Sequence, residues 1–577
     1  MPQLTLSSFP PRNRGWAILL ALCLTVTVCG CASLWRGKSD KSDQETGLRE
    51  LMKAPALPDL VRDATVPHGM QSIRVDGVGA VNGLPGTGGP ANPSIFRDQL
   101  LEEMKRHDVA DPNHFLERND TALVRVRASV PPGARRGDSI DIRILAPKES
   151  QVTDLHGGRL LDTRLRQQQM LQNAVRQSDV MAIAIGSVLT RSDFQPGADE
   201  ALRIEGNILG GGRVQITRKL GLVLRPKYQH AKMAAAISAA INRRFFFFDG
   251  TTRRGISKAM EDDFIEIDVH PRYRDNLGRL MDVVQAIGAE PESAETQARL
   301  ADLADRLSKP EKARDAALQL ESIGESAVPT LLEGARSTNP ELRFYAAETL
   351  AYLDRSESIE PLESAAREIA AFRPQALLAL QGLDKQSAID ALQRLMNEPS
   401  IETRYGSFCA IRRRVDGKRT LSGRPVGSFW LYKVPSTAPP AVVVSLRESP
   451  EIVLIGNTTT VNIPQFMRGP GGLLIKPDPS ETGQLRISRF QPGKDDQRAT
   501  VSNSISALIE GIVAVGGGYG DVIAVLRAAK DEGYMTEQLA IDPLPKSSRL
   551  YFRDEESDED AATPSESEAD AVITGSS

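Results

Sequence analysis

Cysteine is scarce in this sequence, and its placement excludes a disulfide framework. The chain of 577 residues has four cysteines, of which Cys23, Cys29 and Cys31 lie close to the N-terminus. If that leading stretch is cleaved and Cys31 is modified, Cys409 is the one free thiol left, so no internal disulfide can form. A lone cysteine without a partner motif is more often a small buried apolar residue than a nucleophile.

The sequence also lacks the common catalytic and cofactor-binding motifs. It has no GxSxG, CxxC or HExxH pattern and no phosphate-binding loop. Six histidines occur, and the one cluster places His107 and His114 near Asp108 and Asp111 in a predicted loop after a helix. Such residues are more often exposed surface groups than metal ligands. The sequence therefore predicts no catalytic residue, no cofactor and no metal.

Net charge is small, which argues against a nucleic-acid partner. The chain has 71 basic and 75 acidic residues, for a formal charge of -4, and this is not the footprint of a nucleic-acid-binding protein. The C-terminal end differs from the rest, because residues 554–577 contain nine acids and no base. A segment so polar cannot bury a core, so residues 546–577 are predicted to form an acidic disordered tail.

The segment 1–30 has the three parts of a secretory signal peptide. Arg12 and Arg14 precede the apolar run Trp16–Val28, and small residues follow it. The run has about 13 residues, whereas a membrane-spanning helix needs about 20. We therefore expect the segment 1–30 to be removed on export rather than kept as a transmembrane anchor.

The segment Val28–Cys31 resembles the lipobox of bacterial lipoproteins. This resemblance implies cleavage between Gly30 and Cys31 and lipidation of Cys31, which becomes the first mature residue. Two or three acyl chains hold a protein stably on a bilayer. The second mature residue, Ala32, is not aspartate, which favours the outer membrane under enterobacterial sorting rules. The alternative is an ordinary signal peptide that happens to contain cysteines.

Residues 31–71 are predicted to form a tether, because their first part is mostly charged residues and serine. From Ile73 the pattern changes to a strand, glycine-rich turns and a helix. A glycine-rich loop before a helix suggests nucleotide binding, but Gly77, Gly79 and Gly83 do not have GxGxxG spacing and no Gly-Lys-Ser/Thr follows. Tight turns beside a packed surface are the favoured interpretation.

Alternating apolar and polar residues predict a β-rich body beyond residue 120. The strands expected are Ala122–Val130, Ser139–Leu145, Val180–Leu189 and Val214–Leu224. A helix is predicted over Gln229–Arg243 from the spacing of Ala and Ile. The run Phe245–Phe248 that follows is consistent with a partner-binding patch, but a buried strand is favoured because exposed aromatic β-formers invite aggregation.

Residues 295–400 are rich in Ala, Leu, Glu and Arg at helical spacing. Pro329 and Pro361 recur in similar sequences, each near the start of an amphipathic helix, and Ser387–Leu392 is a weaker third copy. This resembles a short stack of HEAT-like helical hairpins, bounded here at residues 295–415. Such a stack usually offers a binding surface, and a plain helical spacer is the alternative.

The β pattern returns after residue 440, and the chain then closes with helices. Strands are predicted at Ala441–Leu446 and Glu451–Ile455, and helices at Ser504–Val515 and Asp521–Asp531. The fold class predicted is therefore α+β: a multi-domain β-rich body with an inserted α-helical repeat segment.

Six segments in one order resemble the bacterial flagellar P-ring protein family. They are Asp76–Gly88, Val130–Asp141, Leu155–Leu165, Ala236–Phe245, Val453–Ile463 and Asp521–Gly533. The resemblance implies a P-ring-like N-terminal body at residues 72–294 and a P-ring-like C-terminal part with a terminal helix pair at residues 416–545. The lipobox, the single mature thiol and the helical stack are departures from the family pattern.

The resemblance implies a non-catalytic structural subunit of the periplasmic ring that surrounds the flagellar rod as a bushing and supports bacterial motility. The implied partners are further copies in a homo-oligomeric ring, the rod and L-ring components of the basal body, and the membrane through the lipid. The implied location is the periplasm, at the flagellar basal body and with the anchor in the outer membrane. One alternative is an envelope lipoprotein scaffold whose HEAT-like surface binds a protein partner, and another is an unrecognised periplasmic enzyme.

Overall fold

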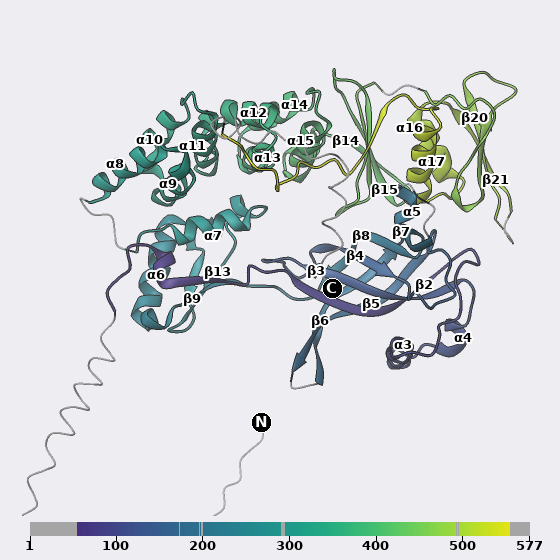
Figure 1. Ribbon diagram of the computed structural model, residues 1–577, viewed down its shortest axis with the longest axis horizontal. Helices are drawn as coiled ribbons and strands as arrows, with labels where there is room; N and C mark the ends of the chain where they lie inside the picture. The colour runs from purple at the N-terminus through teal and green to yellow at the C-terminus, as the bar shows by residue number, and fades with distance from the viewer. Residues whose placement is uncertain are drawn as a thin grey trace, which may run out of the picture. The chain divides into compact units, whose positions relative to one another are not determined.

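The computed structural model describes residues 55–553, apart from residues 172–173, 196, 198–199, 290–294, 458–459, 492 and 494. The chain divides into two units, Met1–Pro55 and Ala56–Ser577, and the elements described belong to the second. A β-rich part, a run of helices and a second β-rich part follow one another along it (Figure 1). The predicted α+β class is confirmed. Within the described ranges, no helix has the length and apolar character needed to cross a membrane.

A small antiparallel sheet packs against helices, and it combines one strand from the start of the described chain with three later strands. Its strands, in spatial order, are β1 (Thr65–His68), β9 (Leu220–Leu224), β13 (Phe264–Ile267) and β12 (Ser257–Ala259). The helices that share its core are α2 (Val61–Ala64), α6 (Ala231–Arg244) and α7 (Leu277–Gln285). Helix α6 forms because Met233, Ile237 and Ile241 recur every four residues and bury one face. Helix α2 and strand β1 lie inside the range 31–71 that the sequence assigned to a tether.

The second sheet closes on itself. Its strand order is β4 (Ser139–Leu145), β3 (Thr121–Val130), β2 (Ile73–Asn82), β5 (Arg159–Leu171), β6 (Ala174–Ser187), β8 (Glu205–Val214) and β7 (Leu189–Thr190). Strand β4, at one end of this order, also pairs with β8, and this pairing closes the sheet. In β4, Ile140, Ile142 and Ile144 are buried while their neighbours are not, as the alternation of a strand requires. The predicted strand Val214–Leu224 is wrong as one element, because β8 ends at Val214 and β9 begins at Leu220.

In the described chain, three helices lie beside the closed sheet, and a run of helices follows the small sheet. The helices beside the closed sheet are α3 (Ile95–Arg106), α4 (Pro112–Leu116) and α5 (Arg191–Phe194). The run comprises α8 (Glu295–Leu307), α9 (Pro310–Ile323), α10 (Val328–Gly334), α11 (Pro340–Tyr352), α12 (Ile359–Glu368), α13 (Arg373–Gly382), α14 (Gln386–Leu395) and α15 (Ile401–Arg413). Pro329 and Pro361 lie in the first turns of α10 and α12, where a missing N–H leaves no helical hydrogen bond unmade.

The C-terminal part contains two further sheets and a helix pair with a common core. One sheet has the order β14 (Ser422–Val426), β15 (Phe429–Val434), β17 (Glu451–Ile455), β16 (Ala441–Val444) and β22 (Gln538–Ile541). The other has the order β18 (Met467–Arg468), β19 (Leu473–Pro477), β20 (Gln484–Arg489) and β21 (Gln497–Ser502). The helices are α16 (Ile505–Ala514) and α17 (Tyr519–Asp531). Sequence patterns predicted β16, β17 and both helices.

Two sequence expectations need correction. The run Phe245–Phe248 is not a buried strand: Phe245 is buried, but strand β10 (Phe246–Asp249) forms a separate two-stranded sheet with β11 (Thr252–Gly255), and Phe248 is 66% exposed. The second concerns the tail predicted for residues 546–577. Its described part contacts the helices, since Arg549 pairs with Glu402 of α15 and Arg553 pairs with Glu341 of α11. Residues 554–577 lie outside the described residues.

The remaining elements of the described chain are single 3-10 turns. They are η1 (Glu200–Leu202), η2 (Pro226–Tyr228), η3 (Pro271–Tyr273), η4 (Glu325–Ala327), η5 (Ser356–Ser358), η6 (Gly417–Arg419) and η7 (Pro470–Gly472). Several connect consecutive helices or lead from a strand into a helix, as η4 and η5 do in the helical run.

Candidate functional site

The residues singled out from the sequence do not form one site. Gly30 and Cys31, the predicted cleavage and lipidation position, lie outside the described residues. His107 follows helix α3 and its ring contacts Arg164, whereas the main-chain N–H of His114 donates to the Asp111 carboxylate at the start of α4, 3.3 Å away. These side chains serve local turns and caps. Across the described ranges, no group of His, Cys, Asp and Glu is arranged to hold a metal ion.

The glycine-rich segment is used for close strand packing. Gly77 and Gly79 lie in β2 where it faces β5, at a place where the register between these strands shifts. A Cβ atom on Gly77 would lie 2.6 Å from the main-chain oxygen of Arg164, and one on Gly79 would lie 2.2 Å from the Thr163 hydroxyl. Only glycine allows these strands to approach so closely. This local geometry accounts for the glycines without a nucleotide.

Three clusters of buried charged residues, in contrast, join distant parts of the chain. The first, which we call the His156 junction, consists of His156, Asp193 and Asp521. His156 lies just before β5, Asp193 lies in α5, and Asp521 lies in the first turn of α17. The His156 Nδ1 atom is 2.8 Å from Asp193 Oδ1, and its Nε2 atom is 2.9 Å from Asp521 Oδ1. One imidazole therefore links the closed sheet to the C-terminal helix pair.

Each carboxylate of this junction is also held by main-chain donors. The N–H of Thr190 donates to Asp193 over 2.9 Å, and the N–H of Gly518 donates to Asp521 over 2.8 Å. Each carboxylate caps the start of its own helix, where unpaired N–H groups favour a negative charge. The imidazole side chain is 12% exposed, so it sits between two fixed anions with little water around it.

The electrostatics of the junction favour a charged imidazolium. Burial alone would lower the pKa of His156, but the hydrogen bonds and charges of Asp193 and Asp521 outweigh it and raise the pKa to about 10. Burial would raise the pKa of Asp521, but the hydrogen bond and positive charge of His156 bring it below its ordinary value. The junction is therefore a stable ion triad at neutral pH rather than a group ready to exchange protons.

A second cluster, the Arg279 junction, joins α7 to the helical run. Arg279 donates to Glu321 of α9 over 3.0 Å through Nε and lies 2.6 Å from Glu348 of α11. Its guanidinium also stacks over the ring of Tyr352, 4.6 Å from the centroid. Burial raises the pKa of Glu321, although Arg279 opposes that rise. Two carboxylates surround one arginine, and the hydroxyl of Tyr273 donates to Glu321 over 2.5 Å.

A third cluster joins α15 to strand β17. Glu451 is almost fully buried, lies 3.3 Å from Arg412 and accepts a hydrogen bond from Tyr405 over 3.2 Å. Cys409 lies beside this group, and burial followed by the charge of Glu451 raises the pKa of its thiol to about 12. A thiol so far from ionisation is a poor nucleophile, which agrees with the packing role predicted for Cys409.

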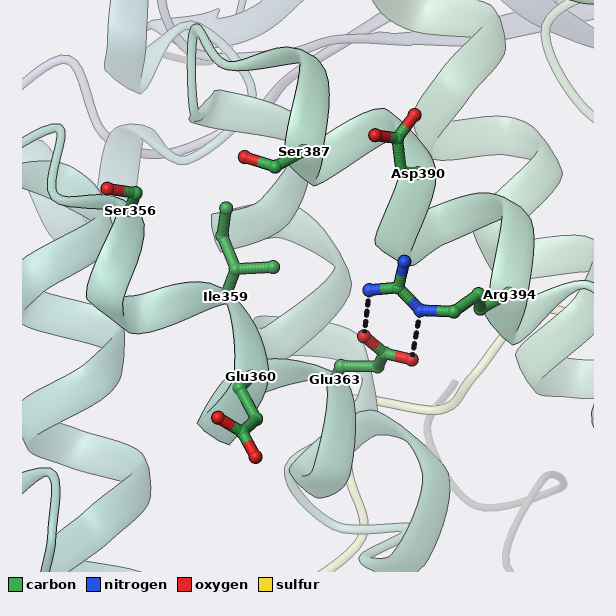
Figure 2. Close-up of a pocket in the computed structure, with 7 residues that line it drawn as sticks. All are labelled: Ser356, Ile359, Glu360, Glu363, Ser387, Asp390 and Arg394. Carbon is green, nitrogen blue, oxygen red and sulfur yellow. Dashed lines mark hydrogen bonds and ion pairs between the residues drawn. The ribbon is translucent and has the colours of Figure 1, made fainter.

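The helical run also has a surface hollow, with a volume of 470 Å³, between α12 and α14. Figure 2 shows Glu363 and Arg394 facing each other within it. Arg394 donates to the Glu363 carboxylate twice, over 3.0 and 2.6 Å. These two charges neutralise each other, and the exposed carboxylates of Glu360 and Asp390 remain around them. The hollow therefore presents a weakly acidic protein surface and no assembled catalytic group.

Sequence reasoning missed all three buried ionic clusters, namely the His156 junction, the Arg279 junction and the cluster around Glu451. His156 stands within the segment Leu155–Leu165 that carried the family resemblance, but its partners lie far along the chain. One signal was available for Asp521: it follows Gly516–Gly518 at the start of a predicted helix, where a carboxylate is favoured. Nothing in the local pattern indicated that this cap would also face a histidine.

The described elements define a multi-domain α+β protein in which buried charges join one part of the chain to another. The sequence model of the family described as flagellar P-ring protein matches residues 60–300. This range contains the small sheet and the whole closed sheet. Residues 60–300 thus match the flagellar P-ring protein family, and over this range the resemblance found in the sequence is confirmed.

Individual relatives agree with this assignment. The chain is 27% identical over 241 residues to a flagellar P-ring protein of Thermotoga maritima, covering 40% of this chain and 67% of the relative. It is 29% identical over 198 residues to one from Gluconobacter oxydans, covering 32% and 50%. It is 30% identical over 211 residues to one from Sodalis glossinidius, covering 34% and 54%. The alignments thus span from half to two thirds of these relatives.

Proposed function

We propose that this protein is a structural subunit of a periplasmic ring around the flagellar rod, without a catalytic role. The observation that carries the proposal is the family match over residues 60–300, which takes in two complete sheets. The three buried ionic clusters support it further, because they hold parts of the chain together and the thiol beside the third, Cys409, is a poor nucleophile. The match also favours a ring subunit over an envelope scaffold that works through the helical run alone.

A ring imposes requirements on the subunit. Head-to-tail contacts close into a ring only when each copy offers two different complementary faces to its neighbours. The net charge of -4 over 577 residues leaves little long-range repulsion to oppose packing of many copies. Further copies of this chain and the other basal-body components are the partners proposed, in the periplasmic part of the cell envelope.

The lipid anchor belongs to the same proposal. Cys31 would carry the acyl chains, and the outer membrane is the side favoured by Ala32. In cells, a Cys31→Ser variant should move from the membrane fraction to the soluble periplasm, and a Cys409→Ser variant is the matched control that should not. Unchanged fractionation of the Cys31 variant would contradict the anchor and leave the ring proposal standing.

The helical run is proposed to be a HEAT-like insertion at residues 295–415, between P-ring-like parts at residues 72–294 and 416–545. Support comes from the end of the family match at residue 300, close to the start of α8 at Glu295. Antiparallel helices that follow one another in this way bury a continuous seam. The run then adds to the family fold a surface that the ring can present to other envelope components.

Deletion of the gene tests the main proposal. A strain without this protein should lose swimming and yield basal bodies that lack the corresponding ring, and the intact gene supplied in trans should restore both. Electron microscopy of purified basal bodies measures the ring directly, and a motility plate measures swimming. A deletion strain with complete basal bodies and normal swimming would exclude the ring role.

A further inference from the structure

The hairpin formed by β10 and β11 stands apart from every sheet described above. Within the described part of the chain its strands pair only with each other, with Phe246 opposite Gly255 and Asp249 opposite Thr252. We call residues 243–255 the basic aromatic hairpin. They contain four phenylalanines and four arginines, Arg243, Arg244, Arg253 and Arg254, against the single acid Asp249. Phe247 packs against the core of the small sheet, whereas Phe248 is exposed. A two-stranded hairpin is only marginally stable in water unless its apolar side chains are covered.

The side chains of this hairpin expose aromatic rings beside cations. Phe248 is 66% exposed and meets Phe246 edge to face, with the ring centroids 5.9 Å apart. The guanidinium of Arg253 lies 3.7 Å from the centroid of the Phe246 ring. Arg254 lies 5.9 Å from the centroid of the neighbouring Phe247 ring. It also lies 3.7 Å from the exposed Asp268 carboxylate, so Arg253 is the less compensated of the two cations. Arginines are therefore held against the rings, with their charged ends at the surface.

The base of the hairpin is fixed, so this exposure is not a frayed end. Asn242 donates to the main-chain oxygen of Ser257 over 2.8 Å and accepts from its N–H over the same distance. Phe245, the residue before β10, is buried in the core of the small sheet. A rigid base presents the exposed rings in one orientation.

We propose that the basic aromatic hairpin rests on the surface of a phospholipid bilayer that contains anionic headgroups. Aromatic rings partition into the headgroup region while adjacent arginines bind lipid phosphates. The net charge of the hairpin favours an anionic surface and disfavours the same hairpin on a second copy. Phe245 also shares its core with Val61 of α2. The hairpin thus belongs to the domain through which the chain enters from Cys31.

This inference deepens the proposed lipid anchor, because the acyl chains at Cys31 would bring this domain to the bilayer that the hairpin then contacts. The two ideas can fail separately. Vesicle binding of a chain without lipid depends on the hairpin alone, whereas cell fractionation of Cys31→Ser depends on the lipid. Ring assembly in cells is measured by neither.

The test uses the full mature chain with Cys31→Ser, made without the segment 1–30, and its sedimentation with large unilamellar vesicles. Vesicles that mix phosphatidylcholine with phosphatidylglycerol are compared with vesicles of pure phosphatidylcholine, at low and at high KCl concentration. We expect Phe248→Ser to weaken partitioning about tenfold. Arg253→Gln and Arg254→Gln should each weaken it about fivefold on anionic vesicles, and hardly at all on neutral ones.

Matched controls are available elsewhere on the surface. Phe490 is 45% exposed and Arg498 is 66% exposed, so Phe490→Ser and Arg498→Gln remove similar groups outside the hairpin. These controls should bind vesicles like the parent chain. A Phe248→Trp variant should also shift its fluorescence to the blue and be quenched by brominated lipids. Equal binding by parent and hairpin variants would overturn the proposal, as would hairpin variants that lose self-association in solution while vesicle binding stays the same.

Discussion

The imidazole of His156 and the carboxylate of Asp521 are 2.9 Å apart, although 365 residues separate them in the chain. His156 belongs to the segment that matches the P-ring family, and Asp521 belongs to the helix pair near the end of the chain. The contact therefore fixes the family segment to a part outside the match. Burying such charges is costly, and the cost is offset only while every member of the triad is present.

Removal of the imidazole should destabilise this junction strongly. In His156→Leu, both carboxylates of the triad stay buried without the imidazolium, and Arg489, 3.5 Å from Asp521, is the cation that remains. We therefore expect a loss of about 3 kcal/mol in the free energy of unfolding, at the lower end of the range for a broken buried pair. Urea denaturation followed by tryptophan fluorescence measures it, since Trp430 lies in β15 of the C-terminal part. His107→Leu is the control, because His107 is 46% exposed, and it should change stability by less than about 0.5 kcal/mol. Equal stabilities of the two variants would show that the triad does not join these parts.

The same junction predicts a pH dependence with a defined sign. The pKa of His156 rises from 6.5 to about 10 on folding, so its contribution is complete below pH 6.5 and is lost as the pH rises through 10. The pKa of Asp521 falls below 3.8, so its contribution is present above that pH and is lost as the pH falls further. The stability difference between wild type and His156→Gln should therefore be largest between about pH 4 and 6.5.

Denaturation curves for both proteins at pH 5, 7, 9 and 10 measure this difference. A shift of the histidine from 6.5 to about 10 corresponds to at most about 5 kcal/mol. Most of it should have disappeared by pH 10. A difference that stays constant from pH 5 to pH 10 would mean that the imidazole is not charged in the folded protein.

Local pattern was enough to predict much of the fold. Strands β3 and β4 alternate clearly, and helices α6, α16 and α17 carry apolar residues at helical spacing, so each was predicted close to its observed bounds. Strands β18 to β21 were not, since β18 has two residues and β21 is largely exposed and polar. Such strands exist because neighbouring strands pair with them, and no single segment reveals that.

The junctions could not be predicted for a related reason. A buried ion triad depends on which distant segments pack together, and a histidine in a loop gives no sign of its partner. For the Phe245–Phe248 run, the local pattern predicted the strand but not its exposure. Its composition predicts a strand correctly, but burial depends on whether another sheet covers it, and among the described strands β10 pairs only with β11.

Replacing glycine by alanine should have opposite effects on stability at two positions, one in a closely packed strand and one in a helix. In Gly77→Ala the new Cβ would meet the main-chain oxygen of Arg164 at 2.6 Å, so β2 or β5 has to shift, and we expect a loss of about 1–3 kcal/mol. Gly278 lies in the first turn of α7, and a Cβ there would meet nothing within 4 Å. Gly278→Ala should therefore raise stability by up to about 1 kcal/mol. Thermal unfolding of both variants measures the contrast, and equal effects would contradict the close strand contact.

The Arg279 junction should hold the helical run to residues 60–300, the range that matches the family. Arg279→Leu leaves Glu321 and Glu348 buried without their cation, and we expect about 3–5 kcal/mol of destabilisation. The triple variant with Glu321→Gln and Glu348→Gln removes the stranded charges and should recover part of that loss. Amide hydrogen exchange of α7, α9 and α11 locates the effect, which should be absent from α16 and α17. Arg498→Leu, at an exposed arginine, is the control. Faster exchange spread evenly over the chain would indicate global unfolding instead of release of the helical run.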